Sequence, residues 1–125
     1  MANKGVKIIL VEDDENLAEM YTMKFKEEKI VFLYAADGLA GLELVQQETP
    51  QVVLLDIMMP KMDGFAVLSE MRKNEKTRNI PVIMLSNLGQ EADIEKGQAL
   101  GATDYIVKAT MTPSQVIAKV KQYLK

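Results

Sequence analysis

Short polar stretches follow four of the five apolar runs in this chain, and their residue types suit one kind of chemistry. In chain order they are Glu12-Asp13-Asp14, Asp56, Ser86 and Lys108. Carboxylates a few ångströms apart raise one another's pKa unless a cation neutralises them, and oxygen donors suit a hard ion such as Mg²⁺ or Mn²⁺. If these residues converge, we expect Asp13 and Asp56 to bind a divalent metal ion, with Glu12 assisting through water.

A carboxylate beside such an ion can act as a nucleophile toward phosphorus. Phosphoryl transfer depends mainly on in-line positioning and on neutralising the equatorial oxygens of the transferred group. Lys108 would supply positive charge and Ser86 a hydroxyl donor, which together with the metal would stabilise the charge that develops on those oxygens. Asp56 is the candidate acceptor in this interpretation.

The residue types that are missing limit what other chemistry the chain can perform. The 125 residues contain no cysteine and no histidine. Disulfides, thiolate metal sites, Ser-His and Cys-His couples and the usual zinc sites are therefore excluded from this sequence. Any phosphohistidine that donates to Asp56 must belong to a partner.

Charge and hydropathy bear on location and on partners. The net charge is −3 with Lys and Arg scattered, which provides no basic stripe for a phosphate backbone, so we expect no direct nucleic-acid partner. No charged-then-apolar leader opens the sequence, and no apolar run approaches the roughly 20 residues that span a bilayer. We therefore expect a cytoplasmic protein with no membrane partner.

An alternation of strands and helices would bring the polar stretches together. Apolar runs predict strands at Lys7 to Val11, Ile30 to Tyr34, Val52 to Leu55, Ile80 to Leu85 and Thr103 to Val107. Helical spacing of apolar residues marks the segments between them, most weakly around Glu91 to Leu100. Thr112-Pro113-Ser114-Gln115 supplies an N-cap, a first-turn proline and a capping-box glutamine for the last helix.

This order of elements predicts the fold class. Short links between alternating strands and helices favour right-handed crossovers and an open, doubly wound α/β sheet of five parallel strands with five helices. Ligands of such sheets bind at the carboxyl ends of the strands. No linker divides the chain, so we expect one domain over residues 1–125.

Four sequence stretches resemble one known family. Segment 54–64 (LLDIMMPKMDG) closely resembles the phosphoacceptor segment of bacterial response-regulator receiver domains, which include single-domain chemotaxis regulators. Segments 9–14 (ILVEDD), 84–86 (MLS) and 105–108 (YIVK) resemble the family's acidic pair, its strand-four hydroxyl and its switch aromatic with lysine. The resemblance covers the whole chain and implies a flavodoxin-like sheet with strand order 2-1-3-4-5.

The resemblance also implies roles for individual residues. Asp56 would be phosphorylated, and the backbone carbonyl of Met58 would join Asp13 and Asp56 as a metal ligand. Ser86 and Lys108 would contact the phosphoryl oxygens. On phosphorylation Ser86 would move toward the phosphate and Tyr105 would turn inward, remodelling the surface of the fourth helix, fifth strand and fifth helix.

Partners follow from the same resemblance. A histidine kinase or histidine phosphotransferase would donate the phosphoryl group, and a downstream protein target would bind in trans, with the chain itself a monomer or weak dimer. Such a domain catalyses its own phosphorylation and dephosphorylation but is not a turnover enzyme.

Two features concern how the site would be built and how long it stays phosphorylated. Ala109 stands where the family usually has a proline in a cis peptide, and a cis Lys108-Ala109 bond would cost about 3 kcal/mol more than trans. Met58 and Leu88, two residues beyond Asp56 and Ser86, are both apolar. We predict slower self-dephosphorylation than in a Met58→Asn, Leu88→Glu variant.

Three other functions remain open on the sequence alone. A phosphatase with an aspartyl-phosphate would need an Asp-x-Asp arrangement after the first strand and a cap domain. A flavin mononucleotide carrier would need a first loop rich in Ser, Thr and Gly rather than Glu12 to Glu15. A degenerate receiver that only binds proteins is the third, and Ala109 is the one feature that favours it.

Overall fold

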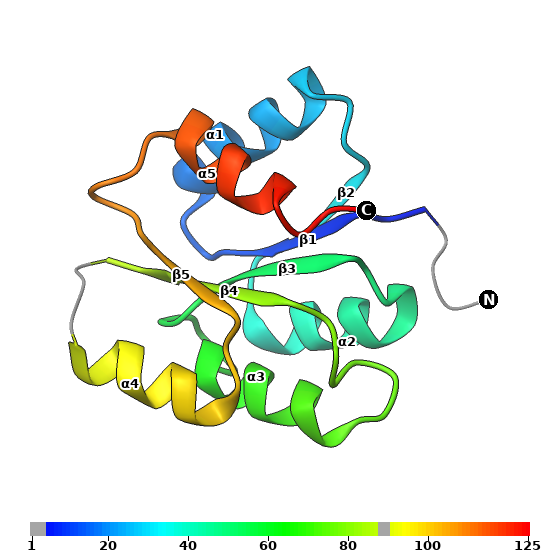
Figure 1. Cartoon of the computed structure of the whole chain (residues 1–125), viewed down its shortest axis with the longest axis vertical. Helices are drawn as coiled ribbons and strands as arrows, with labels where there is room; N and C mark the ends of the chain where they lie inside the picture. Colours follow the sequence, from blue (N-terminus) through cyan, green and yellow to red (C-terminus); the bar gives the residue numbers. More distant parts are fainter. Residues whose placement is uncertain (1–4, 88–90) are drawn as a thin grey trace.

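The computed structural model describes residues 5–87 and 91–125, in which five parallel strands form one sheet in the order β2-β1-β3-β4-β5. The predicted α/β class and strand order are confirmed (Figure 1). The strands are β1 (Ile8–Val11), β2 (Phe32–Ala35), β3 (Val52–Asp56), β4 (Val82–Ser86) and β5 (Asp104–Val107). The helices are α1 (Glu15–Glu27), α2 (Gly38–Glu48), α3 (Gly64–Lys73), α4 (Glu91–Leu100) and α5 (Pro113–Lys121).

Helices cover both faces of the sheet, which explains why the central strands are apolar without alternation. Helices α1 and α5 lie on one face, and α2, α3 and α4 lie on the other (Figure 1). Within β1, Ile8 and Leu10 pack toward α1 and α5, whereas Ile9 and Val11 pack toward α2 and α3. The sheet is therefore buried on both sides, and the polar side chains of the predicted site lie at the ends of its strands.

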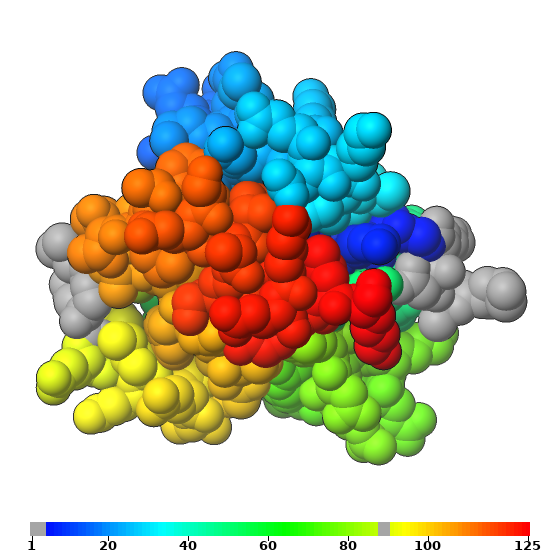
Figure 2. Space-filling model, turned by 45° about the horizontal axis from the view of Figure 1, so that its top comes forward, coloured from blue at the N-terminus to red at the C-terminus, as the bar shows by residue number. Residues whose placement is uncertain are grey.

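Helices α1 and α5 pack side by side and form one outer layer of the molecule. Figure 2 shows α5 spread beside α1 on this face, and an ion pair between Lys121 and Glu28 joins the ends of the two helices. None of the helices in the described ranges is long and apolar enough to cross a membrane.

Local sequence signals account for the helix starts. Asp14, Asp37 and Asp63 cap α1, α2 and α3, each accepting a hydrogen bond from a backbone N–H three residues later. Thr112 caps α5 with the predicted capping box. The second strand begins later than predicted, because Lys29 adopts a left-handed conformation (φ 58°) and the Ile30 N–H donates back to the Phe25 carbonyl of α1.

Candidate functional site

The carboxyl ends of four parallel strands bring the predicted polar residues to one edge of the sheet. Asp56 and Ser86 are the last residues of β3 and β4, and Glu12 and Lys108 directly follow β1 and β5. The register places Asp56 opposite Leu85 and Ser86 opposite Val107, so neighbouring strands end close to one another. We call Glu12, Asp13, Asp56 and Lys108 the acidic corner.

Lys108 holds two carboxylates at once in the acidic corner. Its Nζ lies 2.8 Å from Glu12 Oε1 and 3.0 Å from Asp56 Oδ1. Among the described residues every peptide bond is trans, including Lys108-Ala109. The lysine therefore reaches the acceptor without the cis peptide that the family usually has at this position. Its backbone N–H donates to the Ser86 carbonyl (2.7 Å), which extends the pairing of β4 with β5.

Burial and repulsion make the acidic corner chemically unusual. Glu12 is fully buried and Asp56 is only 4% exposed. Burial, the hydrogen-bonding contact with Glu12 and the charge of that carboxylate raise the pKa of Asp56 to about 8, against the smaller opposing effect of Lys108. Burial alone would lower the pKa of Lys108, but its two carboxylate partners outweigh this and raise it. One ammonium thus neutralises two buried carboxylates incompletely.

Glu12 is also tied into the turn that follows β1. Its Oε2 accepts a hydrogen bond from the backbone N–H of Asp14 (3.1 Å). Its Oε1 has the ion pair with Lys108 as its partner and no hydrogen bond of good geometry. Glu12 therefore contacts protein groups with both carboxylate oxygens, in addition to any role that it has toward a metal ion through water.

The donor set fits a divalent metal ion. Glu12, Asp13 and Asp56 each offer a carboxylate oxygen, and these oxygens lie within 4.8 Å of one another. Asp13 is exposed, whereas Glu12 and Asp56 are buried. Excess negative charge around oxygen donors, open to solvent on one side, is the environment that Mg²⁺ favours. This acidic cluster can therefore bind a metal ion.

A cavity of about 330 Å³ opens beside Asp56. Its lining residues are Asp56, Ile57, Met58, Leu85, Ser86, Asn87 and Asp93. Ser86, which is buried, thus shares a cavity with the candidate acceptor, and the Met58 side chain is 71% exposed at its mouth. Leu88, which the sequence coupled to Met58, lies outside the described residues.

The loop after Asp56 is held close to the strand by α3. The backbone N–H of Gly64 donates to the Ile57 carbonyl (2.8 Å). A Cβ at position 64 would lie 2.2 Å from the Asp56 carbonyl oxygen, so glycine is required for this approach. The Asp63-Gly64 pair therefore starts α3 and also fixes the backbone of the acceptor segment.

Tyr105 lies beside this cavity rather than in the acidic corner. Its hydroxyl donates to the Asp93 carbonyl in the first turn of α4 (2.9 Å). Asp93 in turn lines the cavity next to Asp56. The predicted switch aromatic therefore contacts the helix that borders the site.

Two tyrosines near the acidic corner were not predicted from the sequence. The Tyr34 hydroxyl donates to the Glu12 carbonyl (2.6 Å), although the end of the second strand looked devoid of site residues. Tyr21 is fully buried on α1, where burial raises its pKa and the charges of Lys108, Glu12 and Asp56 act on it. For Tyr34, the sequence offered one signal of this contact, namely a tyrosine near the carboxyl end of a predicted strand.

Comparison with known families decides which fold family this is. The family model described as response regulator receiver domain matches residues 8–121. The chain belongs to this family. A receiver domain is a phosphoacceptor of two-component signalling, and the acidic cluster of this one can hold a metal ion. Membership decides against the phosphatase and flavin-carrier alternatives.

Curated relatives of this receiver are transcriptional regulators of greater length. A "Probable transcriptional regulator ycf27" of Guillardia theta is 38% identical over 119 residues, which are 95% of this chain and 45% of that protein. The "DNA-binding dual master transcriptional regulator RpaA" of Synechocystis sp. is 34% identical over 119 residues, 95% of this chain and 49% of that protein. The chain spans about half the length of these relatives.

Solved receiver structures match over almost the whole chain. Chemotaxis response regulator CheY4 of Vibrio cholerae superposes with a TM-score of 0.87 at 25% identity, covering 95% of this chain and 98% of that one. The BeF3-activated N-terminal receiver domain of Klebsiella pneumoniae RstA superposes with a TM-score of 0.85 at 28% identity, covering 95% and 98%.

One expectation about partners was wrong. The sequence led us to expect a downstream protein target in trans and no direct nucleic-acid partner. The relatives overturn this, because they are named transcriptional regulators, one of them DNA-binding, and the matched stretch is only about half of each. The charge pattern behind the expectation describes these 125 residues alone. It carries no information about DNA binding by the remainder of a longer protein.

Proposed function

We propose that Asp56 is the phosphoacceptor of this receiver domain and that a partner's phosphohistidine is the donor. The contact of Lys108 with both buried carboxylates, beside the metal-capable oxygens of Glu12, Asp13 and Asp56, is the observation that carries the proposal. A buried carboxylate with a raised pKa, lining a solvent-accessible cavity, is a typical reactive group.

Each residue has a distinct part in the transfer. A carboxylate oxygen of Asp56 attacks phosphorus in line as the bond from phosphorus to the imidazole nitrogen breaks, leaving an acyl phosphate on Asp56 and a neutral imidazole after protonation. The Lys108 ammonium and the Ser86 hydroxyl bind the phosphoryl oxygens. Asp56 must be ionised to attack, so its raised pKa has to fall when the site is loaded.

Asp13, Asp56 and the backbone carbonyl of Met58 would hold Mg²⁺ or Mn²⁺, with Glu12 nearby. The bound ion supplies charge neutralisation for the phosphoryl oxygens and favours the ionised form of Asp56. Lys108 alone is shared between two carboxylates and leaves that task unfinished.

Phosphorylation would be transmitted through Ser86 and Tyr105. Ser86 lines the cavity of the acceptor, and the Tyr105 hydroxyl contacts the first turn of α4. A shift of Ser86 toward the phosphoryl group gives Tyr105 room to turn inward. The surface of α4, β5 and α5 then changes its packing.

The test is incubation with acetyl phosphate and Mg²⁺, read by intact mass. We expect one phosphoryl adduct on the wild-type protein and none on Asp56→Asn. Asp104→Asn is the matched control, because Asp104 also pairs with a lysine but lies at the other end of the sheet. An adduct on Asp56→Asn, or none on the wild type, would contradict the proposal.

Two further properties belong to the same proposal. The domain catalyses its own phosphorylation and dephosphorylation without being a turnover enzyme, because the group that it phosphorylates and dephosphorylates is its own Asp56. A cytoplasmic location agrees with a sequence that contains no cysteine. We also expect Met58 to slow hydrolysis by limiting the approach of water.

A role in transcription is favoured by the names of the relatives. We infer that the phosphorylation state of this receiver regulates DNA binding, because one of its relatives is named as a DNA-binding transcriptional regulator. Promoter DNA retention by the protein purified from its native host, with and without acetyl phosphate, tests this. Retention that is unaffected by phosphorylation would argue against the link.

A further inference from the structure

The edge strand β2 contacts the backbone of Glu12 in the acidic corner through Ala35 and Tyr34. The register of β1 with β2 ends at the pair Val11 and Ala35. Beyond it, the backbone N–H of Glu12 donates to the Ala35 carbonyl (3.1 Å), and the Glu12 carbonyl accepts from the Tyr34 hydroxyl (2.6 Å). Both backbone polar groups of Glu12 are therefore bound by β2 after the strand pairing has ended.

The Tyr34 hydroxyl replaces a hydrogen bond that the sheet can no longer provide. After Ala35 the chain turns into Asp37, the N-cap of α2, so β2 offers no further ladder. A carbonyl beyond the end of a strand has no ladder partner to fix the orientation of its peptide plane, and leaving it unpaired when buried costs free energy. A phenolic donor on the neighbouring strand fixes its direction, and with it the direction of the next peptide.

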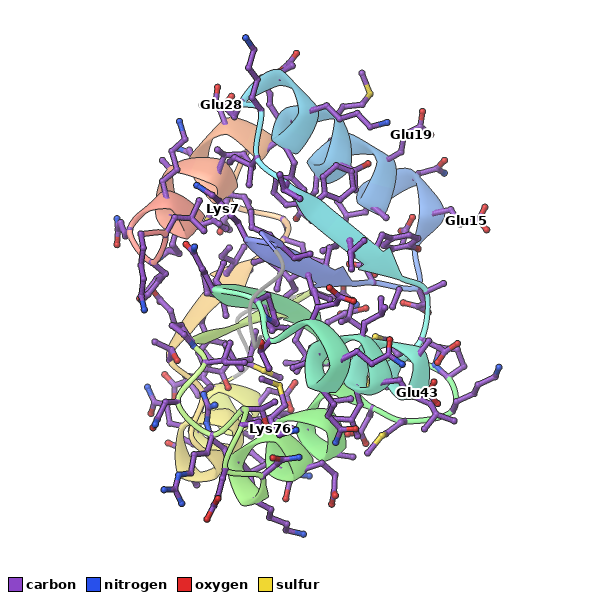
Figure 3. The ribbon with its side chains drawn as sticks, turned by 90° about the vertical axis from the view of Figure 1, so that its right-hand side faces the viewer. Lys7, Glu15, Glu19, Glu28, Glu43 and Lys76 are labelled. Carbon is purple, nitrogen blue, oxygen red and sulfur yellow. The ribbon has the colours of Figure 1, made fainter. Side chains whose placement is uncertain are left out.

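Packing alone does not hold the Tyr34 ring. The ring is half-buried and borders a cavity of about 240 Å³ that is also lined by Glu15, Ala18, Glu19 and Thr22 of α1. Figure 3 shows Glu15 and Glu19 on α1, alongside the edge strand. Because one side of the ring is open, its hydroxyl contact to Glu12 contributes strongly to its placement.

The peptide that Tyr34 fixes leads directly into a candidate metal ligand. Asp13 is exposed and follows the bound carbonyl, and its carboxylate must stay within 4.8 Å of those of Glu12 and Asp56. Repulsion among the three carboxylates opposes that arrangement when no ion is bound. A restraint on the Glu12-Asp13 turn therefore favours the metal-ready geometry.

We propose that Tyr34 is a positioning residue for the metal site, which it prepares by fixing the Glu12 carbonyl and the turn to Asp13. This inference rests on the proposed function, because it concerns the ion that the phosphoacceptor site uses. Residues that orient metal ligands commonly change affinity by 10- to 100-fold when removed. Tyr34 acts through the backbone, so a smaller effect is expected.

Tyr34→Phe removes the hydroxyl and keeps the ring. We expect the Kd for Mg²⁺, measured by titration of amide NMR shifts with MgCl2, to rise about threefold to tenfold. The Mg²⁺ concentration that gives half-maximal phosphorylation by acetyl phosphate should rise by the same factor. The rate at saturating Mg²⁺ should stay within about twofold of wild type, because Asp56, Lys108 and Ser86 are unchanged.

Tyr123→Phe is the matched control. The Tyr123 hydroxyl donates to Asp104 Oδ2 (2.7 Å) and is similarly part-buried, but it lies near the start of β5, at the end of the sheet away from the acidic corner. We expect this variant to keep wild-type Mg²⁺ affinity. Tyr34→Leu also removes the ring. It should raise the Kd for Mg²⁺ at least as much as Tyr34→Phe does, which is a second test of the role of Tyr34.

The outcomes separate this inference from the proposed function. No Mg²⁺ binding by the wild type would overturn the proposed function and this inference with it. Wild-type binding with an unchanged Kd in Tyr34→Phe would overturn this inference alone. An equal loss in Tyr123→Phe, or a lower maximal rate at an unchanged half-saturating Mg²⁺ concentration, would also overturn it.

Discussion

Asp56 and Asp104 each form an ion pair with a lysine, yet their pKa values move in opposite directions. Asp56 lies 3.0 Å from Lys108 Nζ, and its pKa is raised to about 8. Asp104 lies 3.1 Å from Lys119 Nζ, and its pKa is lowered. A lysine at hydrogen-bonding distance therefore does not decide how an aspartate behaves.

The surroundings of the two carboxylates explain the difference. Burial alone would raise the pKa of Asp104, but the Tyr123 hydroxyl, the Tyr105 backbone N–H and Lys119 together lower it. Asp56 is more deeply buried, with 5% of its side chain exposed against 25% for Asp104, and shares its lysine with Glu12. The Tyr105 N–H, the Tyr123 hydroxyl and the Lys119 ammonium all donate to Asp104, whereas Asp56 also faces a second acceptor, Glu12.

This contrast separates a carboxylate with a structural role from the candidate phosphoacceptor. The Asp104 contacts join the start of β5 to α5 and leave the carboxylate satisfied. The acidic corner keeps negative charge that a metal ion or a phosphoryl group with its ion can relieve. The folded chain therefore carries unrelieved electrostatic repulsion at the acidic corner, the candidate binding site.

The largest expected effect comes from removing the lysines. Lys108→Met leaves the buried Glu12 carboxylate and its neighbour Asp56 without a cation and should lower the free energy of unfolding by about 3 to 5 kcal/mol at neutral pH without metal. Lys119→Met removes a more exposed partner and should cost about 1 kcal/mol or less. Urea unfolding with a chelator present measures both. Equal losses in the two variants would show that the two ion pairs are equivalent.

The next effect concerns the pH dependence of Asp56. Its folded pKa of about 8 exceeds the ordinary value of 3.8, so the folded state keeps a proton that the unfolded state releases. Stability is then present at low pH and declines as pH rises from about 4 to about 8. Asp56→Asn lacks this decline and should gain several kcal/mol relative to wild type across that window.

Chemical unfolding at several pH values, with a chelator present, measures this second effect. Adding Mg²⁺ at about pH 8 should restore much of the wild-type stability and leave Asp56→Asn unchanged. A stability difference between wild type and Asp56→Asn that does not vary with pH would contradict the raised pKa.

Asp104 should show the opposite dependence with a smaller size. Its pKa is lowered, so its contribution to stability is present above the ordinary aspartate pKa and is lost as pH falls through the folded value. Asp104→Asn should lower the free energy of unfolding by about 1 kcal/mol at neutral pH. The loss should shrink below about pH 4. Thermal unfolding at neutral and acidic pH tests this, and a loss of equal size at both would count against it.

The strand pattern predicted the acidic corner because its geometry depends on few variables. The carboxyl ends of parallel strands meet at one edge of the sheet. Asp56, Lys108 and Glu12 stand at these ends, so the strand order alone predicts that they lie close together. The trans Lys108-Ala109 peptide was not predictable, because it depends on the path of the whole loop. The roles of the sequence-predicted site residues stay predictions until phosphorylation is measured.

Contacts that depend on exact register or on side-chain volume escaped the sequence. Tyr34 reaches Glu12 only because Val11 pairs with Ala35 and β2 ends there. The Asp104 contacts require α5 to lie over the start of β5. Both results arise from packing between elements, whereas apolar periodicity reports only on single elements.

Tyr105 connects Asp104 to the wall of the Asp56 cavity, and the variants that test this connection have the smallest expected effect on stability. Its backbone N–H donates to Asp104, and its hydroxyl donates to the carbonyl of Asp93, which lines the Asp56 cavity. Gly97 of α4 makes room for it, because a Cβ there would lie 1.6 Å from the hydroxyl. Gly97→Ala should therefore displace the Tyr105 ring.

Two opposing terms then nearly cancel. Alanine favours a helix over glycine by about 1 kcal/mol, and losing the Tyr105 contact costs a similar amount. Gly97→Ala should change the free energy of unfolding by less than about 1 kcal/mol in the wild type, yet stabilise a Tyr105→Ala background by about 1 kcal/mol. A double-mutant cycle measures the coupling. Purely additive changes in the free energy of unfolding would mean that the absence of a side chain at Gly97 does not determine the position of Tyr105. Tyr105 would then not connect Asp104 to α4.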